Sequence, residues 1–340
     1  MIQRKYNLYV CLATAFVAIL IVFVLGTLQK RLGIFDGADA MAIEAAKSLR
    51  SFYPLTLLMY GITSLGSEMG LMIAICVVFW LGYASEAIAF LLMLLFGNII
   101  NTWMKEFFEL ARPAEYKIRW LAHADGYGYP SGHSMVGMLY SWLIYAFANK
   151  YWYLCVIAGL LMASSRIYLG VHFFSDTVGG LICGFGIVVA GTGIYCHVRE
   201  MTSLRESIQK SFVSKIVLSF ALSAAYLILA WGQSGDFKYA GLLAGFFIVY
   251  SLLGLKWRSK NIFFSLIAIV LGLIVLLALR IGLSVMLPKN NLTNYCRYFA
   301  LGSFLAFSPL VFVKMRLMRK LEPAENSERE NETGKEHEDS

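Results

Sequence analysis

The chain has 340 residues, of which 59% are hydrophobic and only 15% are charged. Soluble domains have roughly 25% charged residues, so this composition excludes an ordinary soluble protein and indicates an integral membrane protein. The net charge of +8 does not predict a nucleic-acid partner, because the cations gather at the ends of apolar runs, as in a membrane topology. We therefore expect the lipid bilayer as the partner, and no nucleic acid.

Apolar runs of about the 20 residues that a spanning helix needs recur along the whole chain. We predict an all-α, multi-pass membrane protein with ten spans, at 8–28, 54–82, 86–104, 134–149, 152–168, 174–196, 212–232, 238–256, 261–287 and 295–314. The run at 54–82 is long enough to predict a tilted or broken span. The first run is too long for a signal peptide and lacks a small-residue cleavage site, so we expect it to be retained.

Segments between and after the spans complete the predicted organisation. Residues 36–51 mix small apolar and charged residues at helical spacing, which favours a short interfacial helix over a connecting loop. Residues 1–196 form the predicted core, 197–211 a cytoplasmic linker, 212–314 additional transmembrane helices and 315–340 a disordered cytoplasmic tail. Small residues in the sixth span predict close helix packing within the chain rather than a dimer interface: Gly179, Gly180, Gly184 and Gly186. The oligomeric state stays open.

The distribution of Lys and Arg predicts the orientation of the spans. With Arg4 and Lys5 in the cytoplasm, the basic loops after the fourth, sixth, eighth and tenth spans all fall on the cytoplasmic side. The loops at 233–237 and 288–294, which are nearly charge-neutral, then fall outside. We expect the protein to lie in the cell (inner) membrane if the source is bacterial. In a eukaryote, a location in the endoplasmic reticulum would fit this topology equally well.

Three polar patches interrupt this apolar sequence, all at the predicted outer ends of spans. They read Lys105-x6-Arg112-Pro113, then Pro130-Ser131-Gly132-His133, then Ser165-Arg166-x5-His172-x3-Asp176. Ionisable residues at membrane segments are costly, so such a cluster predicts a functional site. Its position predicts a site on the non-cytoplasmic side.

These residue types suit the cleavage of a phosphate ester. Lys105, Arg112 and Arg166 are expected to bind the phosphate and neutralise its charge. The patches hold no cluster of carboxylates suited to a metal, and the six cysteines form no CxxC pair, so we predict no metal and no other cofactor.

The remaining polar residues predict a nucleophile and an acid. His172 and Asp176 are four residues apart, which on a helix places them on one face, where the carboxylate would orient the imidazole. His172 is then the predicted nucleophile, and His133 the group that protonates the leaving alcohol and later activates water. Ser131 and Gly132 are expected to contact phosphate oxygens.

Together the three patches resemble the signature of the type 2 phosphatidic acid phosphatase (PAP2) superfamily, with every signature position filled across residues 36–196. The resemblance implies a six-helix core, a phosphohistidine mechanism and the residue roles given above. It also implies a hydrolase acting on a lipid monophosphate or diphosphate: phosphatidate, phosphatidylglycerophosphate, an isoprenyl diphosphate, lipid A or a sphingoid-base phosphate. Residues 212–314 lie outside this core, and a scaffold for the lipid groove is favoured over a separate lipid-binding or transport role.

Alternatives remain at this point. A lipid phosphotransferase would use the same phosphohistidine and pass the group to an acceptor other than water. A transporter is disfavoured because the charged cluster gathers on one side, whereas carrier sites lie near the bilayer midplane. Haloperoxidase chemistry, which occurs at similar sites, is disfavoured because those relatives are typically soluble.

Overall fold

The structure, a computed structural model, describes residues 6–148, 152–201, 211–232, 236–254, 256–288 and 290–321. The chain divides into two compact units, one of Met1–Ile75 with Ser85–Thr202 and one of Cys76–Ala84 with Ser203–Ser340. Apart from one pair of short strands, the described elements are helices. The predicted all-α, polytopic class is therefore confirmed.

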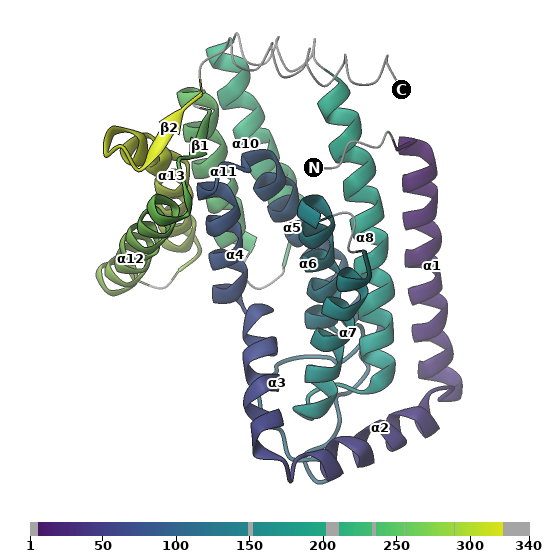
Figure 1. The fold of residues 1–340 in the computed structure, drawn as a ribbon. Coiled ribbons are helices and arrows are strands. Elements are labelled where there is room, and N and C mark those ends of the chain that lie inside the picture. Colours follow the sequence, from purple (N-terminus) through teal and green to yellow (C-terminus); the bar gives the residue numbers. More distant parts are fainter. Residues whose placement is uncertain are drawn as a thin grey trace, which may run out of the picture. The chain divides into compact units, whose positions relative to one another are not determined.

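The first unit contains all three polar patches. Its helices are α1 (Leu8–Leu32), α2 (Asp36–Leu49), α3 (Tyr53–Leu65), the first part of α4 (Glu68–Trp80), α5 (Ala84–Phe108), α6 (Gly132–Ala148), α7 (Trp152–Tyr168) and α8 (Phe174–Glu200). Helices α1 and α8 run side by side, and α2 lies across their ends (Figure 1). A helix rather than a loop at 36–51 is thus confirmed, while its place at the membrane interface stays a prediction.

Glycines on α8 bring neighbouring backbones close to it. A Cβ at Gly179 would lie 2.4 Å from the ring of Tyr129, and one at Gly184 would lie 2.6 Å from the carbonyl oxygen of Met135. Only residues without a side chain allow this approach. The predicted intrachain packing by these small residues is confirmed.

The long span predicted at 54–82 is broken. Helices α3 and α4 form a pair bent by 63°. α3 ends before Gly66, and the Ser67 hydroxyl accepts a hydrogen bond from the Gly70 N–H at 3.2 Å, which caps the start of α4. The break lies beside the polar patches, because the Thr63 hydroxyl contacts Arg166 and Gly66 lies next to the ring of His133.

Besides the end of α4, the described part of the second unit holds four helices and a small sheet. They are α10 (Phe212–Leu229), α11 (Asp236–Leu253), β1 (Trp257–Ser259), α12 (Ile262–Met286), α13 (Asn291–Lys314) and β2 (Met318–Lys320). α11 packs against α10 and α13, and β1 pairs antiparallel with β2. The predicted disordered tail, 315–340, was therefore set too early: 318–320 form a strand because their backbone pairs with 257–259. Residues 322–340 of that tail and 202–210 of the predicted linker lie outside the described residues.

Six helices of the described chain are long and apolar enough to cross a membrane: α1, α5, α8, α10, α12 and α13. The bent pair α3/α4 adds a seventh candidate span. The other predicted spans coincide with α6, α7 and α11, which do not reach the same length and hydropathy within the described residues. The protein is an integral, multi-pass membrane protein, but the count of ten spans stays a prediction.

Candidate active site

The three sequence patches meet in the first unit, where two cations hold the loop between α5 and α6. Lys105, in the last turn of α5, donates to the carbonyl oxygens of Tyr127 and, at 3.2 Å, Gly128. The Arg112 guanidinium donates to the carbonyl oxygens of Gly126 and Asp125, at 2.9 and 2.8 Å. These cations therefore shape the loop as well as supplying positive charge.

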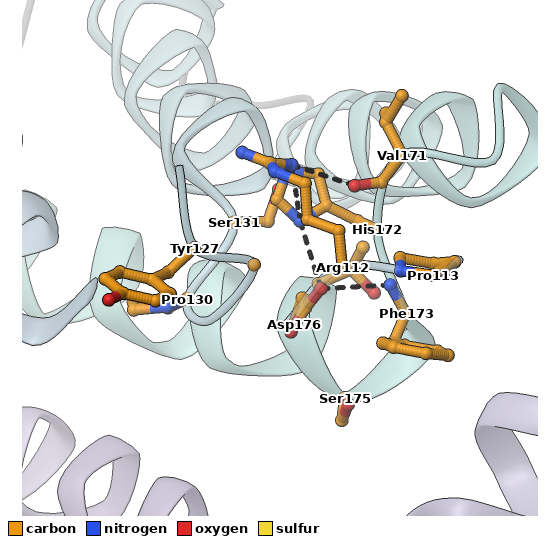
Figure 2. A network of polar contacts seen from close by, with 12 residues as sticks. Arg112, Pro113, Tyr127, Pro130, Ser131, Val171, His172, Phe173, Ser175 and Asp176 are labelled. Carbon is orange, nitrogen blue, oxygen red and sulfur yellow. Dashed lines mark hydrogen bonds and ion pairs between the residues drawn. The ribbon is translucent and has the colours of Figure 1, made fainter. Parts of the chain in front are cut away.

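His172 and Asp176 form a buried pair at the start of α8. The His172 Nδ1 lies 3.1 Å from the Asp176 Oδ2, and the two side chains are 3% and 2% exposed. The same carboxylate oxygen accepts the Phe173 N–H at 3.0 Å (Figure 2). One carboxylate thus caps the helix and orients the imidazole.

Arg112 identifies the tautomer of His172. Its Nη1 lies 2.8 Å from the His172 Nε2 and also donates to the Val171 carbonyl at 2.8 Å (Figure 2). A guanidinium can only donate, so Nε2 must accept. The proton of the neutral imidazole then resides on Nδ1, facing Asp176, and Nε2 carries the lone pair that a nucleophile needs.

Electrostatics keep the imidazole neutral. Burial lowers the pKa of His172 well below its usual 6.5, and the positive charges of Arg112, Lys105 and Arg166 and the neighbouring His133 lower that pKa further. Burial also lowers the pKa of Arg112, while Asp176 raises it. Four of the five other predicted ionisable side chains of the site thus lower the pKa of His172, and the fifth, Asp176, is hydrogen-bonded to it.

The end of α7 presents His172 to the site. Gly170 adopts φ +79°, and its N–H donates to the Ile167 carbonyl at 2.9 Å while the Val171 N–H donates to the Arg166 carbonyl at 3.2 Å. This is a Schellman turn, which favours glycine at the left-handed position. A Cβ on Gly170 would also lie 2.8 Å from the guanidinium of Arg50, so the position excludes larger residues.

The Pro-Ser-Gly-His patch is fixed to both α5 and α8. The Ser131 N–H donates to the Asp176 backbone carbonyl at 2.9 Å, and the Asn101 amide donates to the Pro130 carbonyl at 3.0 Å. The Tyr129–Pro130 peptide is cis. α6 begins at Gly132, so Ser131, Gly132 and His133 lie at a helix N-terminus, which attracts anions.

Arg166 is a buried cation with one N–H donor that no described residue accepts. It is 4% exposed, and its Nη1 donates to the Thr63 Oγ1 at 2.6 Å. Its Nε has no hydrogen-bond partner among the described residues. A buried donor without a partner is rare in proteins, and an anionic substrate would satisfy it.

Sequence reasoning missed several residues that position these groups. Thr63 binds Arg166, and a Cβ on Gly66 would lie only 2.5 Å from the His133 ring. The Asp39 carboxylate accepts both the Ser175 N–H, at 2.8 Å, and the Ser175 hydroxyl, at 2.9 Å. None of these has a sequence signal of its own. Asn101 did have one, because it is a polar residue one helical turn before Lys105 in an apolar span.

Two further observations concern the titratable side chains of the described residues. The described residues contain no group of three or more His, Cys, Asp or Glu side chains that could hold a metal ion. His123 pairs with Asp125 at 3.0 Å, and both side chains are 86% exposed. It does not belong to the buried centre.

Comparisons with known proteins identify the family of this chain. Residues 86–200 match the PAP2 superfamily, and residues 237–320 match the PAP2 superfamily phosphatase, transmembrane extension. Phosphatidylglycerophosphatase B of Bacillus subtilis (strain 168) is 32% identical over 165 residues, which span 44% of this chain and 79% of that protein. The crystal structure described as the first transmembrane PAP2 type phosphatidylglycerolphosphate phosphatase from Bacillus subtilis aligns with a TM-score of 0.48 and 25% identity, over 56% of this chain and 98% of the other. The chain belongs to the PAP2 superfamily and is a membrane lipid phosphatase of that type.

Proposed function

We propose that this phosphatase hydrolyses the phosphate monoester of a glycerophospholipid, with phosphatidylglycerophosphate as the leading substrate, on the non-cytoplasmic side of the membrane. The relative named phosphatidylglycerophosphatase B supports this substrate class. The observation that carries the mechanism is the His172 imidazole, held between Asp176 at Nδ1 and Arg112 at Nε2.

In the first step, the His172 Nε2 attacks the phosphorus and the bond to the lipid oxygen breaks. His133 donates its proton to that leaving oxygen, which releases the lipid alcohol. Asp176 stabilises the positive charge that develops on the phosphorylated imidazole, because its carboxylate accepts a hydrogen bond from the Nδ1–H. In the second step, water attacks the phosphorus, His133 takes a proton from that water, and the P–N bond breaks to release phosphate.

Arg112 must exchange partners for the first step to occur. Its Nη1 occupies the hydrogen-bonding direction of Nε2 at 2.8 Å, so an attacking lone pair has to be freed. A phosphate oxygen is a stronger, charge-assisted acceptor for the same guanidinium. Substrate binding would therefore both position the phosphorus and unmask the nucleophile.

The charge of the site matches a phosphate monoester. The site has three positive side chains, Lys105, Arg112 and Arg166, and one negative side chain, Asp176, so its formal charge is +2. A phosphate monoester carries about −1.5 to −2 at pH 7. Ser131 and the backbone at Gly132 add donors at the start of α6. These groups stabilise the charge that shifts during phosphoryl transfer without requiring a metal in this proposal.

The test is phosphate release by the detergent-purified full chain, with EDTA present, over a panel of lipid phosphates. His172→Gln should abolish release, whereas His123→Gln, an exposed histidine outside the centre, should retain it. Activity of His172→Gln close to wild type would refute the mechanism. Loss of activity in EDTA would refute metal independence. Appearance of a phosphorylated acceptor instead of free phosphate would identify a phosphotransferase.

A covalent intermediate can be observed directly. With a phosphorus-32 aryl phosphate, whose phenolate leaves without protonation, His133→Ala should slow only the second step, so that label accumulates on the protein in an acid-labile form. No label in this variant, together with normal turnover by wild type, would contradict a phosphohistidine.

A further inference from the structure

The second unit contains a cationic cavity that the catalytic mechanism does not use. Its volume is about 320 Å³, and residues of α11, α12 and α13 line it: Lys238, Arg280, Leu283, Ser284, Asn294, Arg297, Tyr298 and Leu301. Three of these side chains are cations and none is a carboxylate. The volume lies within the range of ligand pockets in proteins, roughly 300–1,000 Å³.

Arg297 is built into the wall of this cavity. It is 7% exposed, and its guanidinium donates to the carbonyl oxygens of Leu283, at 3.1 Å, and Pro288, at 2.8 Å. It donates as well to the Leu287 carbonyl and, at 3.2 Å, to the Asn294 Oδ1. The arginine thereby caps the C-terminal end of α12 and neutralises the partial negative charge there. Its side chain is fixed by the fold.

Lys238 and Arg280 complete the positive lining. The Lys238 Nζ lies 6.0 Å from the centre of the Tyr298 ring, which orients it toward the cavity. Arg280 lies six residues before Met286, the last residue of α12, and Lys238 lies two residues after the start of α11. At about 1.5 Å of rise per residue, these cations lie within roughly 9 Å of the helix ends. Where the helix ends lie at the surface of a bilayer, lipid headgroups and their phosphates occupy this depth.

We propose that this cavity binds the phosphate of an anionic phospholipid headgroup, as a second anion site within the transmembrane extension. Lys238, Arg280 and Arg297 converge on one cavity, where a phosphate would offer charge-assisted contacts to them. Ser284, Asn294 and Tyr298 offer neutral hydrogen-bonding groups beside the cations, and Leu283 and Leu301 offer an apolar wall for the lipid backbone. A zwitterionic headgroup would bring a cation of its own into a cationic cavity, so the site should prefer a net negative lipid.

Native mass spectrometry of the detergent-purified full chain tests the proposal. Wild type is incubated with phosphatidylglycerol, with phosphatidylcholine or with inorganic phosphate. Arg280→Gln should lower the affinity for phosphatidylglycerol roughly tenfold, and Lys238→Gln less, because each removes one charge-assisted contact. Arg258→Gln, which removes an exposed cation of β1 outside the cavity, is the matched control and should bind as wild type does.

The arms of this experiment separate the possible ligands from one another and from the catalytic centre. Arg112→Gln alters the catalytic centre and should keep the phosphatidylglycerol adduct. Binding of inorganic phosphate that Arg280→Gln removes, without lipid binding, would identify free phosphate as the source of the anion. Equal binding by Arg280→Gln, Lys238→Gln and Arg258→Gln, or equal binding of phosphatidylcholine by wild type, would overturn the proposal. Thermal unfolding of each variant serves as the check of folding.

Discussion

The candidate active site of the first unit and the cationic cavity of the second unit each contain three positive side chains, but among the described residues only the first also contains histidines. In the catalytic centre, Arg112 and Arg166 surround an imidazole that Asp176 orients. In the cavity, Arg297 is bound to carbonyl oxygens, and none of the described residues that line the wall is a histidine or a carboxylate. Positive side chains are sufficient to bind an anion. The proposed phosphoryl transfer also needs a neutral imidazole with a defined tautomer. Substitutions that disturb the histidines or Asp176 should therefore lower kcat more than they weaken substrate binding.

The largest expected effect comes from Asp176→Asn. The amide can present an N–H to the His172 Nδ1 and so favour the opposite tautomer, with the proton on Nε2. We expect kcat to fall by about 10²- to 10⁴-fold, by analogy with the loss of the orienting aspartate in other triads, while KM changes little. Steady-state kinetics on detergent-solubilised lipid phosphate would measure this. A kcat within a few-fold of wild type would show that Asp176 is only a helix cap.

Gly66→Ala should produce the next largest effect. The added Cβ would lie 2.5 Å from the His133 ring, so the imidazole has to move. A shift of the acid that protonates the leaving group should lower kcat roughly tenfold or more. Gly61→Ala, in the helix α3 that ends just before Gly66, is the matched control because nothing lies within 4 Å of its new Cβ. Equal kinetics of the two variants would mean that His133 adapts or does not act as the acid.

Thr63→Val should have a smaller effect that falls on substrate binding. It removes the acceptor for the Arg166 Nη1 while keeping the shape of the side chain. Losing a hydrogen bond to a charged group costs about 1.5–3 kcal/mol, part of which the bound phosphate can restore by accepting from the freed donor. We expect a rise in KM of several-fold to tenfold with kcat nearly unchanged. A loss confined to kcat would show that Thr63 acts on the reacting atoms instead.

The smallest expected effect is on the pH dependence of stability. The pKa of His172 is well below 6.5 in the fold, so below pH 6.5 the unfolded chain takes up a proton that the folded chain excludes. Stability should therefore fall as pH drops through and below 6.5, by up to about 1.4 kcal/mol per pH unit from this residue. Thermal unfolding of His172→Gln between pH 8 and 5 should show a flatter profile than wild type. Parallel profiles for the variant and wild type would contradict a neutral, buried His172.

Much of this site was predictable because its key spacings are local. His172 and Asp176 are one helical turn apart, and the apolar runs around the three patches show which ends of the spans meet. All eight predicted site residues lie in the first unit, while their catalytic roles stay predictions for the experiments above. The transmembrane extension was predicted as helical from its apolar runs, but its cationic cavity was not.

The sequence by itself determined the membrane class, the helical segments and the identity of the polar patches, because hydropathy and short-range spacing carry that information. The tertiary structure decided which residues support the patches. Asp39 binds Ser175 across 136 positions, Thr63 binds Arg166 across 103, and Gly66 leaves room for His133. Such contacts depend on how distant helices pack, and a single sequence contains no periodicity that links residues so far apart. The strand at 318–320 was unpredicted for the same reason, since its partner strand lies at 257–259.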